Sequence, residues 1–430
     1  MTSPDAEISL PTADTDGSGK GRLLVLTSTW PRWRGDTTTS FVRDLTGRLN
    51  GLGWEAEVLA PHAPGAARDE VDDGMVVHRF RYLWPESAET VCYGSGALVN
   101  LRQRPLELAK VPMLVAAEQA ATLRAVRTRR PDVIHAHWLI PQGLVAGLVP
   151  GTHAPPAVIT VHGGDVFALD QRGMRAAKRL ALSRAAAVTV NSSATERVVL
   201  DLGTDPTKVH RIPMGINVDR PADQQQVAAI RAEHGTDDGP FCVLVGRVLA
   251  EKGVFDLVEA VAKARDGGRA ISAAVVGDGQ DREAAQRRAR ELGVGDRVDF
   301  VGWVAPAEVP SWLAAADVVV APSRTASDGW VEAQGLAITE AMAAERPVVA
   351  TRTGGITDAI TDGETGVLID EACPDGLARA VLALHDDPDR AGRLASAARR
   401  RAVQTYTDTS TAERMSAVLS ETAARARGSR

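Results

Sequence analysis

The feature that most constrains the fold is a regular alternation of short apolar runs with longer helical patterns. The runs are rich in Val, Ile, Leu and Ala along their whole length, so both faces of each predicted strand should be buried. They lie at residues 22–28, 55–60, 75–80, 132–137, 157–163, 186–192 and 209–213, and again at 241–246, 272–279, 297–302, 317–323, 346–351 and 366–370. The pattern predicts an α/β protein whose parallel sheets are covered by helices.

The alternation is interrupted once, by a polar, proline-containing stretch that we take as a linker at about residues 214–240. A chain of 430 residues also exceeds what one hydrophobic core usually holds. We therefore expect two doubly wound, Rossmann-like domains, residues 21–215 and 216–395, facing each other across a cleft. Folds of this kind bind ligands at the carboxyl ends of their strands. Residues 1–20 lack a signal-peptide pattern and are expected to form a disordered tail.

Composition excludes several classes of function. The net charge of −6 argues against nucleic acid as the main partner, because phosphate backbones favour basic surfaces. The cysteines Cys92, Cys242 and Cys373 are far apart and form no CxxC motif. This favours a reducing, cytoplasmic setting without a disulfide framework or a zinc site. No apolar run is long enough to span a membrane.

Charged and glycine residues follow the predicted strands of the second domain. Arg247 and Lys252 come just after the run at 241–246, where two cations could stabilise a diphosphate leaving group. Gly302 and Trp303 end the run at 297–302 and could line a nucleobase pocket. Each feature also has a plainer interpretation: the two cations as surface charge, and Trp303 as a core or lid tryptophan.

The segment EAQGLAITEAMA places Glu332 and Glu340 on either side of the turn Gly335-Leu336-Ala337, which should begin a helix. The start of a helix presents unpaired N–H groups and partial positive charge, and both favour an anion. Carboxylates accept hydrogen bonds from hydroxyls, so the two glutamates could hold the two ends of a nucleotide sugar. Alternatively, Glu340 in the first helical turn is simply favoured by the helix dipole, and Glu332 is a loop charge.

These segments together resemble a known family. The strings GRVLAEKG, VVGDGQ, VDFVGWV, EVPSWLAAADVVVAPS and EAQGLAITEAMAAERPVVATRTGGITD, in this order, resemble the C-terminal half of retaining glycosyltransferases of family 4, which have the GT-B fold. The E-x7-E spacing is met by Glu332 and Glu340. The strings STWPRWRGDTTTSFVRDL, YGSGALVNL, HAHWLIPQG, VHGGD and RIPMGINVD are similar to the N-terminal half, though less specifically, and the resemblance covers roughly residues 22–400.

The resemblance implies a role for each matching residue. Arg247, Lys252, Gly335, Leu336 and Ala337 would bind the donor diphosphate, and Glu340 the ribose, with Gly302 and Trp303 beside the nucleoside. Catalytic roles fall to His162, against the donor sugar, and to Glu332; Gly35 and Asp165 lie in loops near donor and acceptor. The C-terminal segment 396–430 would pack back on the first domain through a last helix near residues 408–426. Ala333-Gln334, Asp358 and Asn217 depart from the family pattern, which leaves the sugar and the loop shapes open.

The implied activity is transfer of a sugar, with retention and same-face attack, from a nucleotide-diphosphate sugar to a hydroxyl of a small molecule, a polysaccharide or a lipid-linked glycan. A UDP-sugar is weakly preferred over a GDP-sugar, and neither a metal nor a cofactor is expected. The alternatives are a nucleotide-sugar epimerase or phosphorylase on the same fold, and a nucleotide-sugar-binding protein without catalysis.

Three other sequence features could indicate a metal site or a lipid-binding surface. His135 and His137 could suggest a metal pair, but no third ligand is suitably spaced, and lining of the core or cleft is favoured. The pair Asp387 and Asp389 has the pattern of a helix start. The basic segment 100–131 fits either contact with anionic lipid or, preferably, a solvated face beside the acceptor cleft.

Overall fold

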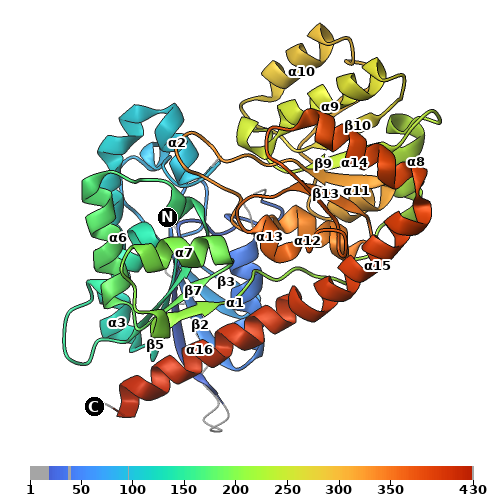
Figure 1. Cartoon of the computed structure of the whole chain (residues 1–430). Coiled ribbons are helices and arrows are strands. Elements are labelled where there is room, and N and C mark those ends of the chain that lie inside the picture. The colour runs from blue at the N-terminus through green and yellow to red at the C-terminus, as the bar shows by residue number, and fades with distance from the viewer. Residues whose placement is uncertain (1–18, 37–39, 95, 429–430) are drawn as a thin grey trace.

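The computed structural model of the protein describes residues 19–36, 40–94 and 96–428, so residues 1–18 of the predicted tail lie outside the described residues. Two sheets form two domains, and helices cover both faces of each sheet (Figure 1). The predicted α/β, doubly wound architecture is confirmed, and every predicted apolar run contains a strand.

The first sheet has the strand order β3-β4-β2-β1-β5-β6-β7-β8 and is parallel except for β3, which is antiparallel to β4. Its strands are β1 (Gly21–Leu26), β2 (Trp54–Pro61), β3 (Asp69–Asp72), β4 (Met75–Phe80), β5 (Val133–His137), β6 (Ala157–Val161), β7 (Ala187–Val190) and β8 (Val209–Arg211). The apolar pattern does not predict β3, because the residues of this strand, DEVD, are mostly acidic. Charged residues are common on exposed edge strands, where they discourage pairing with other chains.

The second sheet is parallel throughout and has the order β11-β10-β9-β12-β13-β14. Its strands are β9 (Phe241–Val245), β10 (Ser272–Val276), β11 (Val298–Gly302), β12 (Val318–Ala321), β13 (Val348–Thr351) and β14 (Val367–Ile369). Successive residues of β9 alternate between two cores: Phe241 and Val243 enter one, and Cys242 and Leu244 the other. This burial on both faces explains why the strands are apolar along their whole length.

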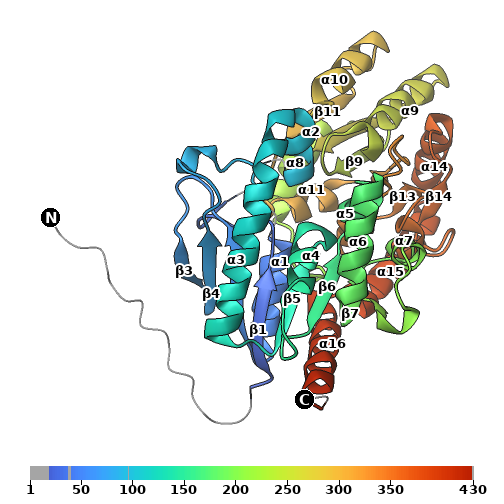
Figure 2. The ribbon, with the colours of Figure 1, turned by 90° about the vertical axis from the view of Figure 1, so that its left-hand side faces the viewer.

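The helices of the first domain are α1 (Phe41–Gly51), α2 (Ala97–Gln103), α3 (Val111–Arg129), α4 (Leu144–Gly147), α5 (Gly164–Phe167), α6 (Arg172–Arg184) and α7 (Ser193–Asp201), with short turns η1 (Glu86–Ala88), η2 (Pro105–Lys110), η3 (Leu139–Gly143) and η4 (Pro206–Lys208). Helices α3, α4, α6 and α7 supply residues to the core on one face of the sheet, and α1 and α16 (Asp408–Gly428) to the core on the other. Figure 2 shows α3 and α6 in front of the strands.

The second domain contains α8 (Gln224–His234), α9 (Val254–Asp266), α10 (Arg282–Glu291), α11 (Val309–Ala315), α12 (Leu336–Ala343), α13 (Ile356–Ala359), α14 (Pro374–Asp386) and α15 (Pro388–Thr405), with the turn η5 (Ala250–Lys252). The linker predicted at 214–240 is too long, because α8 occupies much of it and buries Ile230 in the core of the second domain. Asp223 caps α8 by accepting hydrogen bonds from the N–H groups of Gln225 and Gln226. The long polar face of α8 concealed this helix.

The chain crosses between the domains twice, and the two crossings are hydrogen-bonded to each other. The N–H of Ile216 donates to the carbonyl of Tyr406 (2.8 Å), and the N–H of Asp408 donates to the carbonyl of Ile216 (3.0 Å). The boundary predicted at 395/396 therefore lies too early, because α15 buries Ala398 and Ala402 in the second domain. Only α16 returns to the first domain, where Trp54 Nε1 donates to Ser416 Oγ.

Candidate active site

A cavity of about 990 Å³ lies between the two domains. The first domain contributes Thr160 and His162 to its wall, at the carboxyl end of β6, and α12 of the second domain contributes Leu336 and Glu340. Residues from both domains thus meet at one space, beside the carboxyl end of a parallel strand, where folds of this kind bind ligands.

His162 is held in place from two sides. Its backbone N–H and that of Gly163 both donate to Oδ1 of the buried Asp165, whose Oδ2 accepts a hydrogen bond from the N–H of Leu139. Its ring lies against Phe41 and Trp138, with centroids 5.0 and 4.9 Å away. Asp165 is therefore a buried brace for the turn that carries His162, and burial raises the pKa of its carboxyl.

The ring of His162 is hydrogen-bonded to His137, for which the sequence predicts only a place in the core or cleft wall or, less favoured, in a metal pair. Nε2 of His162 lies 3.1 Å from Nδ1 of His137, and the two rings stack with centroids 5.3 Å apart. Burial lowers the pKa of His162 to about 3 and that of His137 well below its usual value, with neighbouring histidines adding to both shifts. Both rings are therefore neutral near pH 7, and one nitrogen of the pair donates to the other.

The predicted diphosphate turn begins α12. Gly335 has φ 78° and ψ 70°, a left-handed conformation that suits glycine, and no side chain caps this helix start. The Ile338 N–H donates to the carbonyl of Gly335, so the groups available to an anion at this helix start are the N–H groups of Leu336 and Ala337. Lys252 forms an ion pair with Glu332, and its ammonium lies 5.2 Å from the centroid of the Trp330 ring. Arg247 follows β9 and is exposed.

The residues just before this turn touch the first domain beside His162. An ideal Cβ added to Gly163 would lie 2.4 Å from Cβ of Ala333, so the backbone at Gly163 and the side chain of Ala333 are in close contact. Gly163 follows His162 in the chain, and Ala333 follows Glu332. The fold therefore brings His162 and Glu332, the two predicted catalytic residues, to facing sides of the domain boundary.

Glu340 lies in the second turn of α12 rather than in its first turn, as the sequence analysis had assumed, because the helix begins at Leu336. The helix dipole is therefore not the reason for a carboxylate at this position. Burial raises the pKa of Glu340 to about 7, against the opposing effect of the positive charge on Arg220. A carboxylate kept in such a position at the wall of a cavity is available to a hydroxyl-bearing ligand.

This pKa predicts that donor binding weakens as the pH falls. Ionised Glu340 accepts hydroxyl hydrogen bonds through both oxygens, whereas protonation turns one oxygen into a donor. For a pKa near 7, the ionised fraction falls about 10-fold between pH 8 and pH 6. We expect the affinity for a nucleotide-diphosphate sugar to fall by about the same factor in calorimetric titrations. Such a sugar suits the test because, unlike a free nucleoside diphosphate, it lacks a terminal phosphate that titrates near pH 6. In Glu340→Gln this pH dependence should disappear; an unchanged dependence would assign it to another group.

The remaining predicted residues, like Arg247, Lys252 and Glu332, are not among the residues that line the cavity. Trp303, directly after β11, is 55% exposed, and Gly302 ends that strand with φ 88°. Gly35 lies in an exposed turn of the loop after β1. Asp387 caps α15 by accepting a hydrogen bond from the N–H of Arg390, so the Asp387-Pro388-Asp389 segment is a helix start. Within the described residues, no group of three or more His, Cys, Asp or Glu side chains could hold a metal ion.

The basic segment 100–131 forms α2, η2 and α3. Arg102 pairs with Asp328 of the second domain, so the start of this segment bounds the space between the domains. Leu106 and Leu108 of η2 and Met113 of α3 are exposed apolar residues nearby in the sequence. Among the described residues, no helix is long and apolar enough to cross a membrane. The preference for a solvated face over lipid contact stays a prediction.

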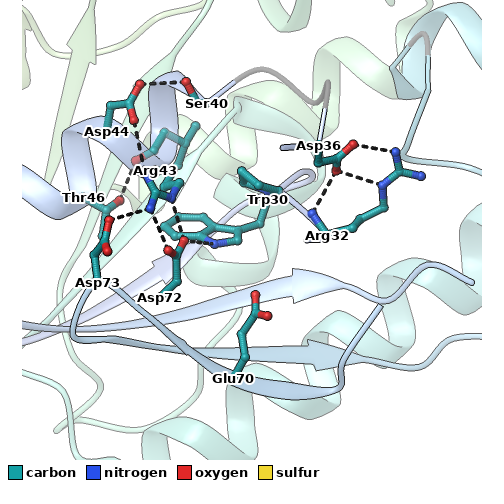
Figure 3. A network of polar contacts seen from close by, with 12 residues as sticks. Trp30, Arg32, Asp36, Ser40, Arg43, Asp44, Thr46, Glu70, Asp72 and Asp73 are labelled. Carbon is teal, nitrogen blue, oxygen red and sulfur yellow. Dashed lines mark hydrogen bonds and ion pairs between the residues drawn. The ribbon is translucent and has the colours of Figure 1, made fainter. Parts of the chain in front are cut away.

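A charged network that the sequence analysis missed lies on the first domain beside the cavity (Figure 3). Arg43 of α1 donates to both oxygens of Asp72 at 2.7 Å and to Asp73, and Trp30 Nε1 also donates to Asp72. Burial favours the neutral form of Asp72, but the bonds from Arg43 hold its pKa below the ordinary value. Arg43, Asp44 and Asp73 line the cavity.

Comparison with known proteins agrees with this geometry. Residues 38–220 match the family described as Glycosyltransferase Family 4, and residues 226–401 match Glycosyl transferases group 1. A 2-deoxystreptamine glucosyltransferase of Streptomyces kanamyceticus is 30% identical over 79% of this chain and 87% of its own length. A GDP-mannose-dependent alpha-(1-6)-phosphatidylinositol monomannoside mannosyltransferase of Mycobacterium tuberculosis is 29% identical over 88% and 92%. The protein of the same name from Mycolicibacterium smegmatis is 34% identical, but the match spans only 49% of this chain and 56% of that relative.

Solved structures share the whole fold. HepE of Anabaena in complex with UDP and glucose has a TM-score of 0.71 at 20% identity, covering 93% of this chain and all of that one. A sucrose-phosphate synthase of Thermosynechococcus elongatus has a TM-score of 0.74 at 23% identity, covering 92% and 97%. With two facing Rossmann-like domains, the E-x7-E turn at their boundary and relatives that span most of its length, the chain belongs to glycosyltransferase family 4 and has the GT-B fold.

Proposed function

We propose that the protein is a retaining glycosyltransferase that moves a sugar from a nucleotide-diphosphate sugar to an acceptor hydroxyl without a metal ion. The observation that carries this proposal is the contact between the turns of His162 and Glu332 across the domain boundary. A donor whose diphosphate lies on the amides of Gly335, Leu336 and Ala337 has its sugar between these two side chains. Its ribose then reaches Glu340 on the wall of the same cavity.

In the proposed reaction, the bond between the sugar C1 and the diphosphate oxygen breaks, and a bond from C1 to the acceptor oxygen forms on the same face. The proton of the acceptor hydroxyl passes to the departing diphosphate. Arg247, Lys252 and the free N–H groups of α12 stabilise the negative charge that develops on the leaving group. His162 is neutral, because burial keeps its pKa at about 3, so it serves as a hydrogen-bonding partner of the sugar and not as a base.

The ion pair between Lys252 and Glu332 has a consequence for the donor. A diphosphate that takes Lys252 as its partner releases the Glu332 carboxylate, which can then accept hydrogen bonds from the sugar hydroxyls. Diphosphate binding and sugar recognition are therefore linked through one exchange of partners. In the absence of donor, the ion pair with Lys252 provides the largely buried Glu332 carboxylate with a partner.

Two donors should be compared first. A UDP-sugar is our preference from the sequence, and the names of two mycobacterial relatives support GDP-mannose. For the acceptor, relatives named for 2-deoxystreptamine, for D-inositol 3-phosphate and for phosphatidylinositol monomannoside support a cyclic polyol or a glycan built on one.

A product assay tests this proposal. Nucleoside diphosphate should be released in proportion to acceptor glycosylation, with the α-configuration of an α-linked donor retained in the product by NMR, and EDTA should leave the rate unchanged. Turnover that vanishes with EDTA and returns with Mn²⁺ would contradict metal independence. Inversion at C1 would contradict the mechanism. A changed sugar without nucleotide release would indicate an epimerase, sugar phosphate formed from a glycoside and phosphate would indicate a phosphorylase, and donor binding without turnover over the acceptor classes named above would indicate a binding protein.

A further inference from the structure

Gln334 connects residues 332–335, which we call the donor turn, to the crossing between the domains. It lies between Ala333 and Gly335 and is 4% exposed. The N–H of Met214 donates to its Oε1 (2.7 Å), and its Nε2 donates to the carbonyl of Met214 (2.8 Å). The side-chain amide therefore pairs with both backbone groups of one residue, as an adjacent strand would, and all the polar atoms involved have partners.

Met214 stands at the hinge between the domains. Two residues later, Ile216 is hydrogen-bonded to Tyr406 and Asp408, which belong to the returning crossing. The residue between, Gly215, lies so close to this crossing that an added Cβ would be 2.4 Å from Cα of Asp408. The outgoing and returning segments and the donor turn are thus joined in one hydrogen-bonded unit.

The four residues of the turn divide the contacts among them. Glu332 pairs with Lys252 of the second domain, Ala333 touches Gly163 next to His162, and Gln334 holds the hinge. Gly335 then begins α12, whose N–H groups face the predicted diphosphate. The turn is thereby located by two contacts outside the body of its own domain, one at the reaction centre and one at the hinge.

We propose that Gln334 is a positioning residue: through its two hydrogen bonds to Met214, it fixes the donor turn relative to His162 of the opposite domain. This inference rests on the proposed function, since it assigns a role within the same site. Gln334 is also one of the positions at which the chain departs from the pattern of the family that it resembles.

The test replaces Gln334 with methionine, which has a similar length and shape but makes neither hydrogen bond. We expect kcat to fall by about 10-fold, because small misplacements between reacting groups have large effects on rate. The dissociation constant for free nucleoside diphosphate should change by less than about twofold, since Arg247, Lys252, Glu340 and the α12 amides all remain within one domain. The Met214 amide should also exchange its hydrogen faster, because it loses its acceptor.

Asp358→Asn is the matched control. Asp358 also bridges the two domains, accepting hydrogen bonds from the N–H and Oγ of Ser193 at 2.5 and 2.6 Å, but it lies outside the donor turn. The kcat of Asp358→Asn should stay within about twofold of the wild-type value. An equal loss of kcat in both variants would show that any contact between the domains has this effect, and would overturn the proposal.

Three other results would also overturn it: full kcat in Gln334→Met, a loss of nucleotide affinity as large as the loss of kcat, or unchanged exchange of the Met214 amide. Hydrogen exchange of the Met214 amide and nucleotide affinity are both measured without turnover. They therefore test the hydrogen bonds between Gln334 and Met214 separately from the proposed transfer reaction. If Gln334→Met does not fold, Gln334→Glu replaces it. That variant still accepts from the Met214 N–H but places a carboxylate beside the Met214 carbonyl, and the same split between kcat and nucleotide affinity is expected.

Discussion

Replacing His162 with alanine is expected to lower turnover by about 100-fold or more, on the scale of a lost transition-state contact. The affinity for free nucleoside diphosphate should stay nearly unchanged, because the predicted nucleotide-binding residues lie in the other domain. The physical reason is the position of the ring: it lines the cavity, and its backbone is held by Asp165. Steady-state kinetics and calorimetry of the same preparation measure the two effects.

A control must separate this effect from damage to the domain. His210 of β8 is a partly buried histidine in the same sheet, and His210→Ala should keep turnover within about twofold of the wild type. Thermal unfolding of both variants then shows whether the first domain is intact. If His162→Ala retains full activity, the histidine is only part of the cleft wall and the proposed reaction centre is wrong.

The pH profile gives a second check on the role of His162. Burial and the nearby His135 keep its pKa at about 3, so the ring is neutral throughout the range near pH 7. A general base with an ordinary histidine pKa would produce an acid limb near pH 6.5, and His162→Ala would remove that limb. We expect instead that any acid limb persists in this variant, because it arises from Glu340, whose pKa is about 7.

The fold could be predicted from sequence because the strands that determine it are buried on both faces. Residues such as Cys242, Val243 and Leu244 have no polar alternation to confuse the pattern, and helices separate each run from the next. Prediction failed where burial is weak. The strand β3 is an acidic edge, and α8 buries only Ile230 fully, so neither carries a strong hydrophobic pattern.

Local spacing predicts the relative positions of site residues only where these residues are close in sequence. Glu332, Gly335 and Glu340 belong to one turn and helix, so their spacing determines their relative positions. The hydrogen bond between His137 and His162 joins residues that are 25 positions apart in the sequence. The hydrogen bonds between Gln334 and Met214 join residues that are 120 positions apart. Such pairs are set by the packing of strands and domains, and local spacing carries no information about them.

The pKa of Glu340 was also beyond sequence reasoning. A glutamate next to a helix start is expected to ionise readily, because the helix dipole favours the carboxylate. In the structure the residue lies one turn further along, where burial raises its pKa to about 7. The difference changes how any experiment on this residue must be designed, since only about half of the unliganded protein carries the charge near pH 7.

Glu340→Gln and Glu332→Gln are expected to impair different steps, nucleotide binding and sugar recognition respectively. The reason is that a diphosphate lying on Gly335 directs the nucleoside to one side and the sugar to the other. Glu340→Gln should weaken both free nucleoside diphosphate and donor, since both contain ribose. A charged hydrogen bond contributes about 1.5–3 kcal/mol, or roughly 10- to 150-fold in affinity. The titrations should be made at about pH 8, where Glu340 is mostly ionised.

Glu332→Gln should leave the affinity for free nucleoside diphosphate intact while lowering turnover or changing the preferred sugar. The ion pair with Lys252 strengthens this expectation, because the mutation frees the ammonium for the diphosphate and so cannot remove a favourable contact with the nucleotide. Calorimetry of both variants with nucleoside diphosphate and with donor distinguishes the two roles. If Glu332→Gln weakens the bare nucleotide as much as Glu340→Gln does, both carboxylates act on the nucleoside side, and the sugar must be recognised by residues outside this turn.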